Sequence, residues 1–209
     1  MTGERASRPP RREFLGAALV LPTAVALAGS RAVAQPRTLA PTPSCVDKGA
    51  PTPPQTAGPF FKPSSPRRTS LIDPGMAGTR IVVAGVVLTT DCRPIPGTLV
   101  DFWHADDRGE YDNAGFRLRG HQFADELGRY RLETIVPGLY PGRARHFHVR
   151  VQAPTQPVLT TQLYFPGEPG NRSDGIFRPE LVMAVRDVES VKTAAFDFVL
   201  VVPAPKPAG

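Results

Sequence analysis

Short apolar runs separated by Pro- and Gly-containing turns recur through residues 81–202, and they restrict the fold more than any other feature. The chain has 25 Pro among 209 residues, which favours many turns and argues against a helical bundle. Residues 114–128, which carry His121, read as irregular. Strands are expected over residues 81–88, 98–103, 129–134, 145–151, 158–165, 181–186 and 194–202. This pattern predicts an all-β fold: an antiparallel β-sandwich with long loops.

The first 34 residues read as an export signal rather than as part of the fold. Arg11-Arg12 forms a twin-arginine region, and the apolar stretch that follows, residues 17–27, is too short to cross a bilayer. Small residues at 32–34 predict cleavage before Gln35. We therefore expect a twin-arginine signal peptide, a mature protein in the periplasm or outside the cell, and no stable membrane insertion after cleavage. Because this route carries folded proteins, often with a cofactor inserted, it favours a metalloprotein.

The mature chain divides by composition into three parts. Residues 35–80, rich in Pro, Ser, Thr and Gly, are expected to form an extended wrap over the sandwich of residues 81–202, and residues 203–209 a disordered tail. Without the leader the chain has 20 basic and 17 acidic residues, a balance too mild to indicate nucleic-acid binding. The only two cysteines are Cys45 and Cys92. In an exported protein they most simply form one disulfide, although two free thiols remain an alternative.

Residues 145–151 alternate with period two. Phe147, Val149 and Val151 share one side, and His146 and His148 the other. Side chains two apart on a strand face the same way, about 7 Å apart at Cα, so the two imidazoles could close on one metal ion. Tyr140 stands on a Pro/Gly turn six residues before the first histidine.

Tyrosine is a hard, anionic oxygen ligand once deprotonated, and a highly charged metal lowers its pKa from near 10. Two tyrosinates and two imidazoles would cancel two of the three charges of ferric iron and favour it over the ferrous ion. Zinc normally takes Cys, His and carboxylate ligands instead. A site with two Tyr and two His therefore selects Fe(III) and leaves room for a substrate oxygen.

Six motifs between about residues 52 and 170 resemble, in order and spacing, those of the intradiol ring-cleavage dioxygenases. They are Thr56-x-Gly-Pro-Phe-Phe, Pro94-Ile95-x-Gly97, Trp103 with Gly109-x-Tyr111, Thr134-Ile-x-Pro137-Gly-x-Tyr140, Arg143-x-x-His146-x-His148 and Thr161-Gln162-x-Tyr164-Phe165. This set is far more specific than His-x-His alone.

The resemblance implies that a non-haem ferric iron is held by four ligands, Tyr111, Tyr140, His146 and His148. It also implies that a catechol-type substrate is cleaved by O2 between its two hydroxylated carbons, to a cis,cis-muconate. Tyr140 would leave the metal when substrate binds and help remove a catechol proton. Arg143 and Gln162 would flank the ring, where Arg143 can stabilise developing negative charge and Gln162 can hydrogen-bond substrate or a bound oxygen.

Departures from the family pattern refine this expectation. Phe61 stands where the family often has Tyr, and residues 35–80 show no long helical segment, which favours the protocatechuate 3,4-dioxygenase-like branch and its exported members. We assign Tyr130 and Tyr164 to packing and do not expect His121 to be a ligand.

Two other function classes compete with this one. The first is a non-catalytic β-sandwich that binds a metal or a carbohydrate, and the second is a cupin-like metalloenzyme, which the absence of any histidine after His148 disfavours. The catechol substituent, the state of the two cysteines and the oligomeric state, a homo-oligomer included, stay open.

Overall fold

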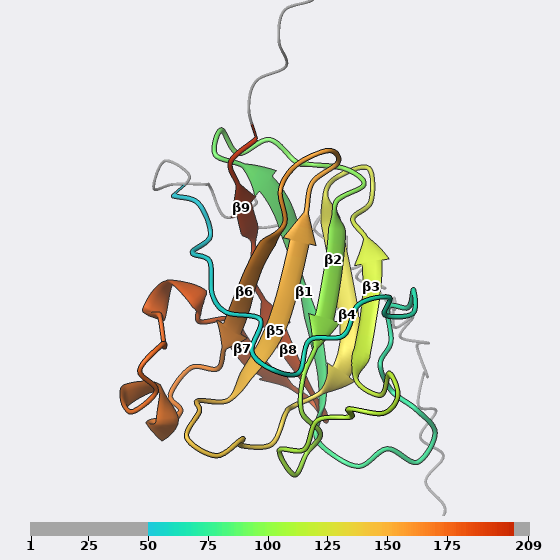
Figure 1. Ribbon diagram of the computed structural model, residues 1–209, viewed down its shortest axis with the longest axis vertical. Coiled ribbons are helices and arrows are strands. Elements are labelled where there is room, and N and C mark those ends of the chain that lie inside the picture. The colour runs from blue at the N-terminus through green and yellow to red at the C-terminus, as the bar shows by residue number, and fades with distance from the viewer. Residues whose placement is uncertain (1–49, 203–209) are drawn as a thin grey trace, which may run out of the picture. The chain divides into compact units, whose positions relative to one another are not determined.

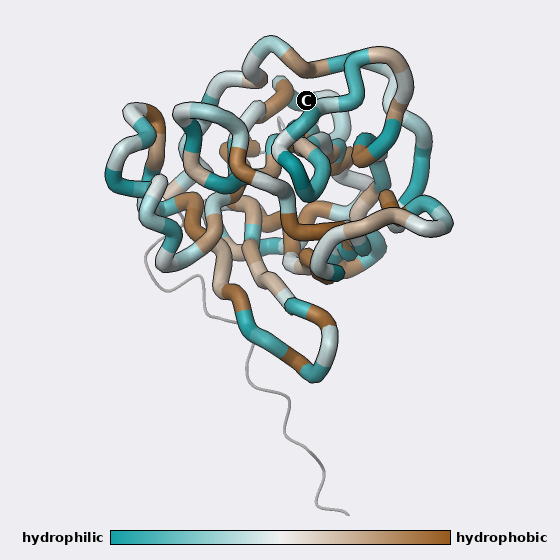
Figure 2. Tube along the Cα trace, turned by 90° about the horizontal axis from the view of Figure 1, so that it is seen from below, coloured by the Kyte–Doolittle hydropathy of each residue, from teal (hydrophilic) through white to brown (hydrophobic). Residues whose placement is uncertain are grey.

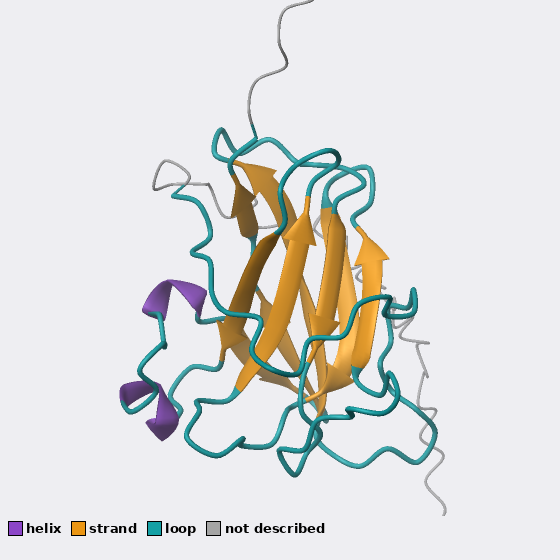
Figure 3. Ribbon diagram, viewed as in Figure 1, coloured by secondary structure: helices purple, strands orange, loops and turns teal. Residues whose placement is uncertain are grey.

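The computed structural model describes residues 50–202, which fold into two facing β-sheets (Figures 1 and 3). One sheet has the order β4-β1-β8-β7, with β9 also paired to β1, and the other has the order β3-β2-β5-β6. The strands are β1 (Arg80–Thr89), β2 (Leu99–Trp103), β3 (Arg119–Phe123), β4 (Arg129–Ile135), β5 (His146–Gln152), β6 (Leu159–Tyr164), β7 (Ala184–Val188), β8 (Val191–Ala195) and β9 (Phe198–Leu200). Two short 3-10 helices, η1 (Pro169–Arg172) and η2 (Pro179–Leu181), lie between β6 and β7.

The predicted all-β sandwich is confirmed. Most strand pairs are antiparallel, whereas β1 pairs in parallel with both β8 and β9. No helix in residues 50–202 is long and apolar enough to cross a membrane. The expected signal peptide, Cys45 and the expected tail from residue 203 lie outside the described residues, so the predictions for them stand untested. Cys92 lies within the described part and is not a free thiol.

Three expectations about the strands are wrong. The strand expected over residues 181–186 starts only at Ala184, as β7, because Pro179–Leu181 forms η2. Residues 114–128 contain β3, which its polar sequence did not indicate. Its buried Arg119 donates to Phe60 O, and its buried Gln122 accepts from Arg131 N through Oε1. The single strand expected over residues 194–202 is two strands, β8 and β9. They are separated where Phe196 crosses Gly85 of β1, at a point so close that any Cβ on Gly85 would collide with the Phe196 carbonyl.

The core lies between the sheets and is filled by alternate residues of each strand. Figure 2 shows hydrophobic and hydrophilic stretches alternating along the chain, as expected for strands with one face in a core. In β5 the inward side chains Phe147, Val149 and Val151 are fully buried. His146 and His148 therefore point away from the core, on the outer face of the β3-β2-β5-β6 sheet.

An extended strap, residues 52–71, covers this outer face (the cyan-to-teal segment crossing in front of β5 and β2 in Figure 1). At one end Thr52 N donates to Val199 O of β9 and Gln55 N donates to Thr160 O of β6, at 2.9 and 2.8 Å. At the other end Arg68 N donates to His121 O of β3, and Leu71 N donates to Glu133 O of β4. The strap thus links the two sheets at both edges and buries the polar outer face between.

Candidate active site

The two histidines of β5 are held with their Nε2 atoms 3.1 Å apart beneath the strap. His146 Nδ1 donates to the Ala144 carbonyl at 2.6 Å, so its proton lies on Nδ1 and its Nε2 presents a lone pair. The His148 ring stacks on the Trp103 indole, with centroids 4.9 Å apart and an interplanar angle of 5°. A backbone carbonyl and an indole ring therefore orient the pair, and both imidazoles are buried.

Tyr111 and Tyr140 come from two loops whose backbones pack against each other. Tyr111 follows β2 and Tyr140 follows β4, and each stands two residues after a glycine, Gly109 and Gly138. A Cβ on either glycine would collide with the backbone of the other loop. The glycines thus permit a close approach that brings the two tyrosine rings to 5.9 Å between centroids.

The tyrosines and histidines form one cluster. Tyr111 Oη lies 3.4 Å from His146 Nε2, and its ring is 6.0 Å from the His148 ring. The strap supplies Phe60, which stacks on Tyr111 at 4.3 Å and meets Tyr140 edge-on at 5.5 Å. The structure therefore brings together all four side chains that the sequence proposed as metal ligands, from three separate segments.

Burial favours the neutral form of three of these donors. It lowers the pKa of His146 to about 4 and that of His148 well below its usual 6.5, and it raises the pKa of Tyr111 to about 12. Unprotonated imidazoles are the form that binds a metal, whereas the phenol must exchange its proton for a cation.

The donor set fits a metal ion. Two nitrogen ligands at about 2.1 Å from one ion, at roughly right angles, lie about 3 Å apart, which matches the 3.1 Å between the two Nε2 atoms. Nδ1 of His148 is buried with no hydrogen-bond partner. Among residues 50–202 no group of three or more His, Cys, Asp or Glu side chains could hold a metal. The donors that the fold does gather here are two imidazoles and two phenols.

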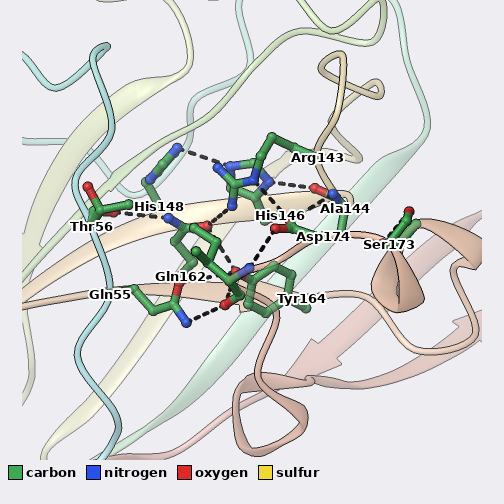
Figure 4. A network of polar contacts seen from close by, with 12 residues as sticks. Gln55, Thr56, Arg143, Ala144, His146, His148, Gln162, Tyr164, Ser173 and Asp174 are labelled. Carbon is green, nitrogen blue, oxygen red and sulfur yellow. Dashed lines mark hydrogen bonds and ion pairs between the residues drawn. The ribbon is translucent and has the colours of Figure 1, made fainter.

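Arg143 and Gln162 lie beside the cluster in one hydrogen-bond network (Figure 4). Arg143 Nη2 donates to Gln162 Oε1 at 2.6 Å, and Gln162 Nε2 donates to Thr56 O of the strap at 2.9 Å. Tyr164, predicted to be a packing residue, is buried and directs its hydroxyl at Gln162 Oε1, 3.1 Å away. With both amide ends engaged, Gln162 in this arrangement supports Arg143.

Sequence reasoning missed Arg119, which ties the Tyr111 loop to the strap. Its buried guanidinium donates from Nε and Nη2 to Asp112 O, at 3.1 and 3.0 Å, and from Nη1 to Phe60 O at 2.6 Å. Nothing in the sequence distinguishes Arg119, because a single charged residue in a polar stretch is normally a solvent-exposed side chain. For Phe60 the Gly-Pro-Phe-Phe motif was a signal, but it indicated only packing.

The remaining candidate side chains lie outside the cluster. His104 Nε2 is 2.7 Å from Thr134 Oγ1, and His121 Nδ1 is 3.1 Å from Ser65 Oγ at the far end of the strap. Tyr130 donates to Phe196 O at 2.7 Å. His121 and Tyr130 hydrogen-bond to groups outside the cluster, whereas His104 is close enough to interact electrostatically with His146 and His148.

Known proteins share both this sequence and this architecture. The chain is 32% identical over 144 residues to hydroxyquinol 1,2-dioxygenase of Nocardioides simplex, covering 57% of this chain and 49% of that protein. It is 36% identical over 119 residues to the protocatechuate 3,4-dioxygenase beta chain of Burkholderia cepacia, covering 48% and 51%. The chain thus spans about half the length of these curated relatives.

A solved structure matches more completely. It is the dioxygenase domain of a dioxygenase–carbohydrate-binding protein fusion from the cellulolytic bacterium Streptomyces sp. SirexAA-E. It is 55% identical, with a TM-score of 0.72, and the match covers 74% of this chain and 100% of that one. A family model described as Dioxygenase matches residues 57–202, which include the whole donor cluster and the strands that carry it. By sequence, sandwich and motif order alike, this chain belongs to the intradiol ring-cleavage dioxygenase family.

Proposed function

We propose that this protein is an exported, non-haem Fe(III) intradiol dioxygenase that cleaves a catechol-type ring between its hydroxylated carbons with O2, giving a cis,cis-muconate. The observation that carries the proposal is the cluster of two phenols and two imidazoles beneath the strap, with Tyr111 Oη and both Nε2 atoms within 3.4 Å of a neighbour. Anionic oxygen and neutral nitrogen donors together suit a ferric ion.

The ligands would be Tyr111, Tyr140, His146 and His148. Fe(III) held there would supply Lewis-acid chemistry: a catechol that chelates it through both oxygens would lose electron density from its ring, which makes a ring carbon open to attack by O2. His146 and His148 are suited to stay in place, because the Ala144 carbonyl and the Trp103 indole fix their rings.

Tyr140 is the ligand suited to leave and take a proton. No other described residue hydrogen-bonds its hydroxyl, whereas Tyr111 Oη faces His146 Nε2. Its loop is open, with Leu139 55% exposed beside it. A phenolate released near a bound catechol is a general base placed within reach of the proton it must accept.

Arg143 and the strap complete the site. The guanidinium, anchored through Nε and Nη2, keeps a fixed positive charge beside the cluster, where it can stabilise negative charge that develops on the ring. Phe60 and Trp103 supply apolar walls against Tyr111 and His148, and so limit access of water and strengthen that charge interaction.

The test is the visible spectrum of the purified mature protein, before and after catechol is added without oxygen. A red protein whose band moves to longer wavelength, and which forms a muconate when air is admitted, would support the proposal. A protein that stays colourless after loading with ferric iron would contradict it and favour the non-catalytic binding module.

We also propose that residues 1–34 direct export through the twin-arginine route. Expression of the full chain should yield a mature protein that begins at Gln35 and lies outside the cytoplasm. Arg11→Lys together with Arg12→Lys should leave the precursor uncleaved in the cytoplasm, measured by mass spectrometry of cell fractions. Normal export of that double variant would contradict the route, and cleavage at another position would contradict the proposed start.

A further inference from the structure

Arg143 is held by a carboxylate that the sequence did not single out. Arg143 Nε donates to Asp174 Oδ2 at 2.9 Å, while Nη2 of the same guanidinium donates to Gln162 Oε1. The Asp174 side chain is only 2% exposed, whereas that of Arg143 is 21% exposed. A buried charge pair of this kind is stabilising only when its geometry is well satisfied.

Asp174 is itself held rigidly. It lies in the loop after η1, and Oδ2 also accepts from Ala144 N at 2.9 Å, while Oδ1 accepts from Ile176 N at 3.1 Å. The carbonyl of the same Ala144 accepts from His146 Nδ1. The Asp174 carboxylate therefore contacts Arg143 directly and is linked through Ala144 to the proposed ligand His146 (Figure 4).

The far side of the network closes on the same loop. Gln55 Nε2 donates to Ile176 O at 2.7 Å. Tyr164 Oη lies 3.1 Å from Gln162 Oε1, 3.2 Å from Gln55 Oε1 and 3.3 Å from Ile176 O, and its one proton is shared among these three acceptors. The strap, β6 and the loop after η1 are thus joined in one ring of hydrogen bonds around Arg143. Bonds in such a ring support one another, so losing one member loosens the others.

We propose that Asp174 is a positioning residue for the ring-cleavage reaction. It fixes the orientation of the Arg143 guanidinium toward the substrate by accepting from Nε, while Gln162, which Tyr164 contacts, accepts from Nη2. This inference rests on the proposed function. A displacement of about 1 Å in a charge-stabilising group can cost about 100-fold in rate. We therefore expect Asp174→Asn to lower kcat by about 10- to 100-fold.

The chain offers a matched control in the neighbouring ion pair. Arg145 Nε contacts Glu168 Oε1 at 2.9 Å, with both side chains about as buried as that of Arg143. Arg145 also donates to Pro137 O. Glu168→Gln should leave kcat within about twofold of the wild type, since its lost ion pair is partly exposed and neither side chain hydrogen-bonds to Arg143, Gln162 or a proposed ligand.

The experiment measures iron content, the charge-transfer band, the anaerobic Kd for catechol and kcat in iron-loaded wild type, Asp174→Asn, Glu168→Gln, Arg143→Ala and the Asp174→Asn/Arg143→Ala double variant. We expect Asp174→Asn to keep its iron, band position and a Kd within about threefold, and to lose kcat. The double variant should be no slower than Arg143→Ala alone, because Asp174 acts through Arg143.

Three results would overturn the inference: unchanged kcat in Asp174→Asn, a double variant slowed by the product of the two single effects, or loss of iron or a shifted band in Asp174→Asn. The last would mean that Asp174 acts through Ala144 and His146. If Asp174→Asn does not fold, Tyr164→Phe tests the network from its other side, with a smaller kcat loss and the same non-additivity expected. A wild type that neither binds nor cleaves catechol would instead refute the proposed function.

Discussion

Tyr111 and Tyr140 bring the same chemical group to the same cluster, but the loops that carry them are held very differently. The Tyr111 side is tied down: Phe60 stacks on its ring, and Arg119 donates to the next carbonyl, Asp112 O. Lys62 Nζ donates to three further carbonyls of that loop, those of Asn113, Ala114 and Gly115, at 3.3, 2.9 and 2.8 Å.

The Tyr140 side is open. Its neighbour Leu139 is exposed, and a Cβ on Gly142 would meet nothing within 4 Å. Mobility is expected where few buried contacts hold a segment. We therefore expect the Tyr111 phenol to stay in place and the Tyr140 phenol to move.

The largest effect is expected from removing the two phenol oxygens in turn. Tyr111→Phe should weaken iron binding by more than about 100-fold, since loss of even an outer-shell partner costs 10- to 100-fold. Tyr140→Phe should keep its iron but lose most of its kcat, because it lacks the oxygen that accepts the catechol proton. Metal analysis and the charge-transfer band distinguish the two. Full iron occupancy in Tyr111→Phe would refute its assignment as a ligand.

Acid should lower the free energy of unfolding by protonating His104, a buried side chain that contacts the segments leading into both the Tyr111 and the Tyr140 loops. Its Nε2 faces Thr134 Oγ1 before the Tyr140 loop, and its Nδ1 faces Ala105 O at the start of the Tyr111 loop. Burial lowers the pKa of His104 to about 4. Since the unfolded state, near 6.5, binds the proton more readily, this stability is present above pH 6.5 and is lost as the pH falls toward 4.

Between pH 7 and pH 4.5 the expected loss is about 2 kcal/mol of unfolding free energy. Denaturant unfolding at pH 7 and pH 4.5 measures it, with His104→Gln as the comparison. The variant should be less stable at pH 7 and should lose less stability on acidification. Equal pH dependence in both proteins would show that His104 is not responsible.

Arg119 should matter to the Tyr111 side more than an exposed arginine does elsewhere. Arg119→Met removes three charge-assisted hydrogen bonds to buried carbonyls, and we expect a loss of about 2–3 kcal/mol. Arg129→Met, whose side chain is 62% exposed in its pair with Asp125, should cost less than about 0.5 kcal/mol. Urea unfolding of both variants gives the comparison. Equal costs would mean that the Tyr111 loop does not depend on Arg119.

The smallest difference in stability is expected between alanine substitutions at two glycines of the Tyr140 loop. Gly138→Ala must push the two loops apart and should cost about 2 kcal/mol. Gly142→Ala has open space, and the only cost is its positive φ of +75°, about 1 kcal/mol. Thermal unfolding of both variants measures the difference. A larger cost at Gly142 would mean that the Tyr140 loop is held more tightly than its open surroundings suggest.

The sequence could predict what local pattern encodes. Alternation placed Phe147 inward and the two histidines outward, and the motif order identified the tyrosines. Prediction from the sequence failed where polar residues, which normally indicate exposure, are buried in the fold. The strand β3 was read as irregular because Arg119 and Gln122 are polar, and Tyr164 was read as packing because nothing local indicates a hydroxyl in a buried network.

By itself, then, the sequence determined the fold class, the family resemblance and the proposed metal-binding side chains, because strand periodicity and motif spacing are properties of neighbouring residues. Only the tertiary structure decided which residues support them. Asp174 lies 31 residues from Arg143, and Phe60 lies 51 residues from Tyr111. Such pairs form only once the strap and the loop after η1 settle onto the sheet, and the hydrogen bonds and stacked rings that join them are specified by the packed fold.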